Sequence, residues 1–188
     1  MPRPDRSRAA LIDTAAQLFR RQGYAATGVN QILQAAHVKA GSLYHHFPNG
    51  KQELAAAVVE SAGGEIEGLL RRFLDSDSSV ADIVGGWIDL LVVQLASDGR
   101  DGCPIEPIAT ESVNASPQAR DASARAFAGW TAAVADRLCA DGWPQDDAEQ
   151  TALALIAMIE GALILSRTAG DDAALTSAKI AARTLLAR

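Results

Sequence analysis

The chain has 188 residues, of which 48% are hydrophobic and 21% are charged, and its formal net charge is −6. This length and apolar content are enough for one or two compact domains with a buried core, and they exclude an intrinsically disordered chain. The two cysteines, Cys103 and Cys139, have neither metal-site spacing nor the number that a disulfide framework needs. We expect reduced thiols, with a redox role as the alternative.

The first residues, MPRPDRSRAALIDTA, are basic and lack the apolar core of a signal peptide. The longest apolar run, 152–165, is interrupted by Glu160 and is shorter than a membrane-spanning helix. We therefore expect a soluble, cytoplasmic protein without a membrane partner.

Charge is divided unevenly along the chain. Residues 1–60 carry a net charge of +3 and all three histidines, whereas the remaining 128 residues carry −9. A basic end on an acidic protein favours binding of a polyanion at that end. This end begins with a helix predicted over residues 5–22. Arg3, Arg6 and Arg8 lie at its start, and they either contact the polyanion or form a solvated tail.

Residues 27–51, TGVNQILQAAHVKAGSLYHHFPNGK, are the most informative part of the chain. A first short helix is predicted from Thr27 as its N-cap and from an apolar stripe with helical spacing: Val29, Ile32, Leu33 and Ala36. A second helix follows almost at once, with Val38 and Leu43 facing the core. His37 occupies the turn, where a left-handed backbone is needed that histidine adopts more readily than most residues. Two helices joined in this way are typical of a helix-turn-helix that binds DNA.

The rest of the chain has helical periodicity and no sustained strand alternation, so we predict an all-α fold with about nine helices. A helix over residues 51–74 contains Gly63 and Gly64, which either form a bending point or pack closely against a neighbouring helix. Further helices are expected over residues 79–96, from 116 or 117 to 140, over 146–168, and from 171 or 172 to 188. The segment SDGRDGCPIEPIATES must break the helical run because it is rich in glycine and proline.

The last two predicted helices are rich in alanine, leucine and isoleucine. They have more apolar surface than one small body needs to cover, which implies a partner surface. We expect a homodimer through these two helices, and the alternative is that both are core helices of a monomer.

The run AHVKAGSLYHHFPNGKQEL resembles the signature of the TetR/AcrR family of bacterial transcriptional regulators, over about residues 7–55. His37 replaces the usual turn glycine, and Lys39 stands where a serine usually caps the second helix. The segments GCPI and GYAATGVNQIL further resemble the LmrA/YxaF-like subgroup. The resemblance implies an N-terminal three-helix helix-turn-helix DNA-binding domain, residues 1–50, and a C-terminal helical ligand-binding and dimerisation domain, residues 51–188. It also implies a repressor that binds a palindromic operator as a dimer and is released by a small aromatic or amphipathic inducer.

The same resemblance assigns roles to residues of the DNA-binding part. Phosphate contacts are expected from Thr27, Tyr44 and Lys51. Base reading is expected from the exposed side of the second helix, with Gly41 allowing close approach: Lys39, Ala40, Ser42 and His45.

The inducer pocket is expected among the helices that follow. Four large side chains on predicted inner faces are candidates, although each could simply fill the core: Trp87, Phe127, Trp130 and Met158. Glu111 and Glu160 are candidates because they are charges in apolar surroundings, where a carboxylate needs a partner such as the ligand, Arg125 or Arg167.

Two other functions remain open. One is a helix-turn-helix regulator controlled by a protein partner, without a small-molecule inducer. The other is an all-helical enzyme that uses His45, His46 and Glu53, but adjacent histidines on a helix point about 100° apart and do not chelate one metal. No nucleophile, phosphate-loop or zinc motif is found in the sequence, so neither enzymatic activity nor a cofactor is expected.

Overall fold

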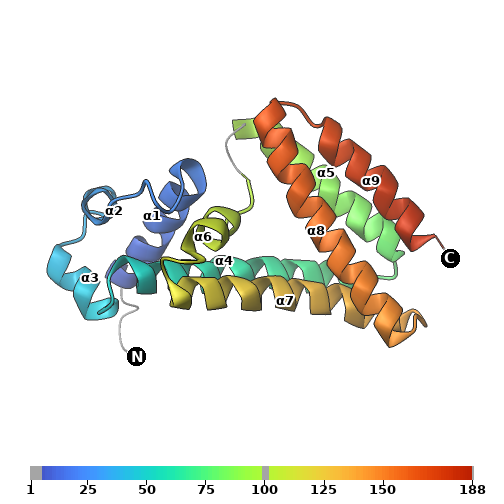
Figure 1. Cartoon of the computed structure of the whole chain (residues 1–188), viewed down its shortest axis with the longest axis horizontal. Coiled ribbons are helices and arrows are strands. Elements are labelled where there is room, and N and C mark those ends of the chain that lie inside the picture. The colour runs from blue at the N-terminus through green and yellow to red at the C-terminus, as the bar shows by residue number, and fades with distance from the viewer. Residues whose placement is uncertain (1–5, 99–101, 188) are drawn as a thin grey trace. The chain divides into compact units, whose positions relative to one another are not determined.

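The computed structural model describes residues 6–98 and 102–187, and every regular element in those two stretches is a helix (Figure 1). The helices are α1 (Arg6–Gln22), α2 (Val29–Ala36), α3 (Ala40–His46), α4 (Lys51–Leu74), α5 (Val80–Asp98), α6 (Glu106–Ser112), α7 (Pro117–Ala140), α8 (Gln145–Ala169) and α9 (Ala173–Leu186). The all-α prediction is confirmed. Arg3 lies outside the described residues.

The glycine- and proline-rich segment that interrupts the helical run also contains a short helix, α6, which the sequence analysis did not predict. Pro107 lies in its first turn, where the missing N–H of proline leaves no helical hydrogen bond unmade. Ile105 and Ile108 are fully buried and fix this helix on the core.

The chain divides into two compact units. The first contains the described residues up to 64 and residues 103–126, and the second contains residues 65–102 and those from 127 onward. Helices α4 and α7 contribute to both units and lie side by side in each. Arg125 pairs with Glu60 at 3.1 Å in the first unit, and Arg71 lies 3.5 Å from Asp136 in the second. The division at residue 50 concerns function and stays a prediction.

In the first unit, α1 packs against α2, α3 and α6. The side chains that form the core of this unit are fully or almost fully buried: Leu11, Ala15, Phe19, Ile32, Leu43, Phe47, Leu54 and Val58. The rings of Phe19 and Tyr24 meet edge to face, with centroids 5.4 Å apart. The apolar stripes of α2 and α3 therefore anchor both helices on α1.

His37 makes the turn between α2 and α3, as predicted. Its backbone is left-handed, with φ 54° and ψ 38°, and no other non-glycine residue in the described ranges has a positive φ. The N–H groups of His37 and Val38 donate to the carbonyls of Gln34 and Leu33 at 3.2 and 3.0 Å. These bonds close the end of α2 in the manner usual for a left-handed C-terminal cap.

Helix α4 runs without interruption through Gly63 and Gly64. A Cβ atom at Gly63 would lie 2.8 Å from the Cβ of Ala126, whereas one at Gly64 would meet nothing within 4 Å. Close packing therefore accounts for Gly63, and Gly64 remains the candidate bending point.

The second unit contains α5, α8 and α9, which pack against one another (Figure 1). One face of α8 is buried: Ala148, Ala152, Leu155, Ile159, Ala162, Leu163 and Ser166. Its other face exposes Leu153, Ile164 and Leu165, and α9 exposes Ile180 and Leu185.

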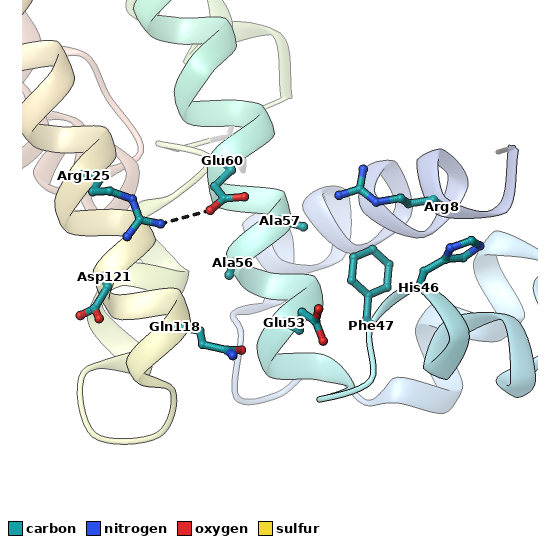
Figure 2. A pocket seen from close by; sticks show the side chains of 10 residues that line it. All are labelled: Arg8, His46, Phe47, Glu53, Ala56, Ala57, Glu60, Gln118, Asp121 and Arg125. Carbon is teal, nitrogen blue, oxygen red and sulfur yellow. Dashed lines mark hydrogen bonds and ion pairs between the residues drawn. The ribbon is translucent and has the colours of Figure 1, made fainter. Parts of the chain in front are cut away.

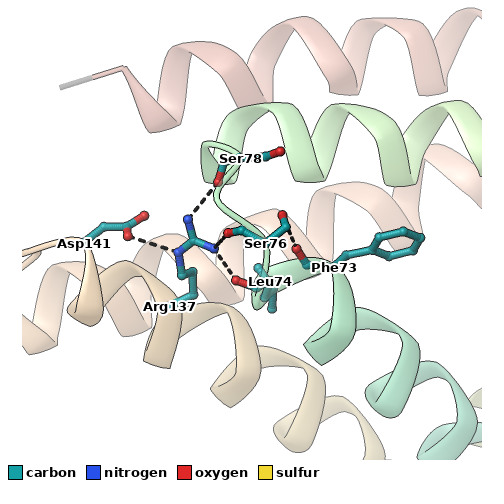
Figure 3. A network of polar contacts seen from close by, with 6 residues as sticks. All are labelled: Phe73, Leu74, Ser76, Ser78, Arg137 and Asp141. Carbon is teal, nitrogen blue, oxygen red and sulfur yellow. Dashed lines mark hydrogen bonds and ion pairs between the residues drawn. The ribbon is translucent and has the colours of Figure 1, made fainter.

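Arg137 on α7 holds the turn between α4 and α5 (Figure 3). One guanidinium nitrogen, Nη1, donates to the carbonyls of Leu74 and of Ser76, the latter at 2.9 Å. The other, Nη2, donates to the carbonyl of Ser78 at 2.7 Å, and Nε donates to Asp141 at 3.0 Å. One side chain thus satisfies the carbonyl of Leu74, at the C-terminal end of α4, and two carbonyls of the turn that follows it.

Helices α5 and α8 are each long and apolar enough to cross a membrane, by length and composition alone. The segments are Val80–Ser97 and Gln145–Ala169, with mean hydropathies of 1.5 and 1.6, and a third of each is buried in the fold. Helix α8 extends beyond the apolar run 152–165 at both ends, so its length does not exclude a membrane-spanning helix. Packed core helices of water-soluble proteins also meet this criterion.

Candidate nucleic-acid interface

Helix α3 is held by one buried residue and exposes most of the rest. Leu43 has no exposed surface, whereas Tyr44 is 54% exposed. The predicted reading residues surround this position: Lys39, Ala40, Gly41 and His45 are exposed, and Ser42 is half-buried. The structure therefore brings the predicted base-reading residues onto one short exposed helix.

Lys39 begins this helix without capping it through its side chain. Its backbone is extended, with φ −79° and ψ 149°, and its carbonyl accepts the N–H groups of Ser42 and Leu43 at 3.0 and 3.4 Å. A serine hydroxyl at this position would accept a helical N–H, but an ammonium has no acceptor. The side chain of Lys39 is exposed instead.

The turn after α3 supports the ring of Tyr44. A Cβ atom at Gly50 would lie 3.4 Å from Cε1 of Tyr44, and Gly50 has a positive φ of 63°. Its N–H donates to the Phe47 carbonyl at 2.8 Å, and the N–H of Asn49 donates to Glu53 at 2.9 Å. The backbone of this turn therefore comes close to one edge of an otherwise exposed tyrosine.

Thr27 does not have the role predicted for it. Gly28 is the N-cap of α2, and no side chain caps that helix. Thr27 has no exposed surface, and its hydroxyl donates to the Gly23 carbonyl at 2.7 Å. The N-cap prediction is wrong because this hydroxyl closes the preceding loop, and we leave Thr27 out of the proposed phosphate contacts.

Lys51 is also turned toward the protein. Its ammonium lies 4.3 Å from the centroid of the Tyr24 ring and donates to the Ala25 carbonyl at 3.5 Å. Burial lowers the pKa of Lys51, and the nearby charge of Glu111 partly offsets this. The ammonium is therefore engaged within the unit, which leaves the backbone N–H groups at the start of α4 as candidate phosphate ligands.

A groove of about 400 Å³ lies beside the end of α3, between α1, α4 and α7 (Figure 2). Its polar lining contains both signs of charge: Arg8, His46, Glu53, Glu60, Gln118, Asp121 and Arg125. Arg125 already pairs with Glu60, and the guanidinium of Arg8 lies 5.5 Å from the Phe47 ring centroid. These contacts link α1 and α7 to neighbouring elements, and the mixed lining does not favour a phosphate.

The aromatic candidates for an inducer pocket lie in the second unit and form two pairs. Trp87 meets Phe73 edge to face at 6.2 Å, and Phe127 meets Trp130 at 5.2 Å. Trp130 is almost fully buried, whereas Trp87 and Phe127 are half-buried. Met158 and Glu160 are half-buried on α8, and Oε2 of Glu160 has no exposed surface.

Glu111 belongs to a different unit from the other pocket candidates. It lies in the first unit, is exposed, and accepts the Ala25 N–H at 2.5 Å. The expectation that Glu111 is a charge in apolar surroundings is wrong, because the segment that carries it packs near α1. This contact spans 86 residues, and no local sequence pattern signals it.

The described residues contain no group of three or more histidine, cysteine or acidic side chains placed to hold a metal. The rings of His45 and His46 lie 4.9 Å apart at 66°. Their geometry agrees with adjacent positions on a helix that point in different directions.

Two family models match the chain. "Bacterial regulatory proteins, tetR family" matches residues 11–58, and "Transcriptional regulator LmrA/YxaF-like, C-terminal domain" matches residues 80–181. The first covers most of α1, all of α2 and α3 and the start of α4, and the second covers most of the helices that follow.

Relatives match over most of their lengths. The uncharacterized HTH-type transcriptional regulator YxaF of Bacillus subtilis is 35% identical over 166 residues, 88% of this chain and 87% of that protein. The HTH-type transcriptional regulator LmrA of Bacillus subtilis is 30% identical over 167 residues, 88% of this chain and 89% of that protein.

Solved structures share the fold at lower identity. A TetR transcriptional regulator from Legionella pneumophila has a TM-score of 0.85 at 20% identity, covering 99% of this chain and 100% of its own. The reduced form of Escherichia coli NemR has a TM-score of 0.84 at 22% identity, covering 96% and 97%.

Proposed function

The chain belongs to the TetR family of bacterial regulatory proteins, with a C-terminal domain of the LmrA/YxaF-like kind, and we propose that it is a repressor that binds a palindromic operator as a homodimer and is released by a small molecule. It is a transcriptional regulator and not an enzyme. The observation that carries the DNA-binding part is the exposed helix α3, which is anchored by buried Leu43 and follows the turn at His37.

Helix α3 supplies the base contacts in this proposal. Lys39 would donate to the guanine acceptors of the major groove, and the methyl of Ala40 would pack against a thymine methyl. Ser42 and His45 can donate or accept, and Gly41 lets the backbone approach the bases. Tyr44 and the first N–H groups of α4 would contact phosphates and so position the helix without reading sequence.

Dimerisation is supported by the exposed apolar residues of α8 and α9. Leu153, Leu165 and Ile180 are 61%, 62% and 66% exposed, and all three lie in the second unit. Such a face on two adjacent helices is typical of a surface that a second copy covers. Covering it also accounts for the apolar character of α8 in a soluble cytoplasmic protein.

The inducer site is proposed in the second unit, at Trp87, Phe127, Trp130, Met158 and Glu160. Two aromatic pairs, on α4, α5 and α7, and a carboxylate on α8 suit a ligand with an aromatic body and a polar or cationic group. A regulator controlled by a protein partner is the alternative, and it would leave these side chains as core.

A selection experiment tests the proposal. Purified protein is incubated with a random duplex library, and the enriched sequences are determined. We expect an inverted repeat whose half-sites lie about one helical turn apart. Titration with planar aromatic compounds should then change the fluorescence of the protein's three tryptophans and release the duplex. Enrichment of no duplex would exclude the proposed function.

A further inference from the structure

The end of α6 meets the loop between α1 and α2. The carboxylate oxygen Oε2 of Glu111 accepts the Ala25 N–H at 2.5 Å. A Cβ atom at Gly23 would lie 2.7 Å from the other oxygen, Oε1. Gly23 has a φ of 91°, so glycine provides both the turn and the space that Glu111 needs.

Lys51 holds the same loop from the start of α4. Its ammonium donates to the Ala25 carbonyl at 3.5 Å and lies over the Tyr24 ring. Ala25 is therefore fixed at both of its polar backbone groups, its N–H by Glu111 and its carbonyl by Lys51. The charge of Glu111 also favours the protonated form of this half-buried lysine.

The loop transmits the position of Ala25 to α2. Thr27, two residues further, is buried and bonds through its hydroxyl to Gly23, and its N–H donates to Tyr24 at 3.3 Å. Helix α2 begins at Val29, directly after this closed loop. Since α2 and α3 are joined by the single turn at His37, displacing Ala25 would displace the start of the helix pair.

We propose that Glu111 is a positioning residue for DNA binding: through Ala25 and Lys51 it fixes the loop that sets the orientation of α2 and α3. This inference rests on the proposed binding of DNA by α3. A carboxylate without a positioning role would instead only repel the phosphates of a bound duplex. The two roles predict changes of opposite sign when Glu111 is replaced.

The first test reads the contact without DNA. The chain has three lysines, Lys39, Lys51 and Lys179, so the Nζ and Cε resonances of Lys51 are readily assigned. In Glu111→Gln we expect the pKa of Lys51 to fall, because the charge that favours its protonated form is removed. In Glu111→Ala we expect the Ala25 amide proton to move upfield and to exchange faster. An unchanged Lys51 pKa together with an unchanged Ala25 amide would overturn the proposal.

The second test measures binding to the duplex that the wild-type protein selects. Glu111→Ala should weaken binding about tenfold, the size expected for one charge-assisted bond. Glu106→Ala is the matched control, because it removes the same charge from the same helix and its carboxylate accepts from Thr110 of α6. The control should bind like the wild type. Unchanged or tighter binding by Glu111→Ala would overturn the positioning role.

These outcomes separate the two proposals. If the wild-type protein selects no duplex, the proposed function fails, and the lysine titration still decides whether Glu111 holds Ala25 and Lys51. Circular dichroism at the assay temperature confirms that both variants are folded.

Discussion

Among single residues, Lys39 is the one whose chemistry separates reading of bases from contact with phosphate. It is exposed at the N-cap of α3, and its side chain makes no capping hydrogen bond. We expect Lys39→Ala to relax the base preference at particular operator positions, by about 1–3 kcal/mol of discrimination. Competition binding against operators with single substitutions measures this. A loss of equal size on every sequence would reassign Lys39 to phosphate contact.

Tyr44 should behave in the opposite way. Its ring is next to Gly50, and more than half of the residue is exposed. Tyr44→Phe keeps the ring and removes only the hydroxyl, so we expect a uniform loss of about 1 kcal/mol on all duplexes. Binding isotherms on the selected operator and on an unrelated duplex test this expectation. A loss confined to the operator would contradict it.

Residues whose role follows from the local pattern were predicted better than those whose role follows from a distant contact. His37 was predicted because the left-handed turn requires particular residue types. Thr27 was misassigned because a hydroxyl beside a helix start serves equally well to close the loop behind it. The inward position of Lys51 depends on the loop between α1 and α2, and the contact of Glu111 depends on α6 packing near α1. No local spacing shows either.

Within the helices, the two adjacent glycines of α4 allow a matched comparison. Gly63→Ala places a Cβ atom against Ala126, and we expect a net loss of about 1 kcal/mol in the free energy of unfolding. Gly64→Ala meets nothing within 4 Å and should add about 0.5–1 kcal/mol by restricting the unfolded chain. Urea unfolding of both variants at one protein concentration measures the difference. Equal effects would mean that packing on α7 does not distinguish the two positions.

The turn between α4 and α5 depends on Arg137. This side chain is only 17% exposed and donates to three carbonyls and to Asp141. We expect Arg137→Met to lower the free energy of unfolding by about 2 kcal/mol, because the carbonyl of buried Leu74 and the carbonyls of Ser76 and Ser78 lose a charged donor. Arg120→Met is the control, since its pair with Asp121 is exposed and should contribute about 0.5 kcal/mol or less. Similar losses in both variants would contradict the role given to Arg137.

Every helix except α6 was predictable, because an apolar spacing of three and four residues can be seen in the sequence without knowledge of the tertiary structure. Helix α6 was the exception, since it has seven residues and its glycine- and proline-rich surroundings resemble a loop. Burial of Ile105 and Ile108 holds it in place, and burial is a property of the fold.

For the whole molecule, charge and apolar surface divide the proposed tasks between the two ends of the sequence. Residues 1–60 carry a net charge of +3 and residues 61–188 carry −9. The phosphates of a duplex therefore attract the part of the chain that contains α3 and repel the rest of the chain. The exposed apolar side chains of α8 and α9 are in the acidic part. The proposed binding to DNA and the proposed binding to a second copy would therefore use different surfaces, so each could be weakened by substitutions that leave the other intact.

Ile180 gives the sharpest test of the dimer. It is 66% exposed on α9, and burying such a side chain contributes about 1.5–3 kcal/mol. In a two-fold symmetric interface each substitution occurs twice, so Ile180→Glu would bring two carboxylates into an apolar surface. We expect this variant to be monomeric by light scattering at micromolar concentration.

Val113→Glu is the matched control, because Val113 is 50% exposed but lies in the first unit. This variant should remain dimeric. The monomeric variant should lose most of its affinity for the inverted repeat and keep weak binding to a single half-site, since α3 is unchanged. A dimeric Ile180→Glu protein would move the interface away from α9, and a monomeric wild-type protein would exclude the dimer.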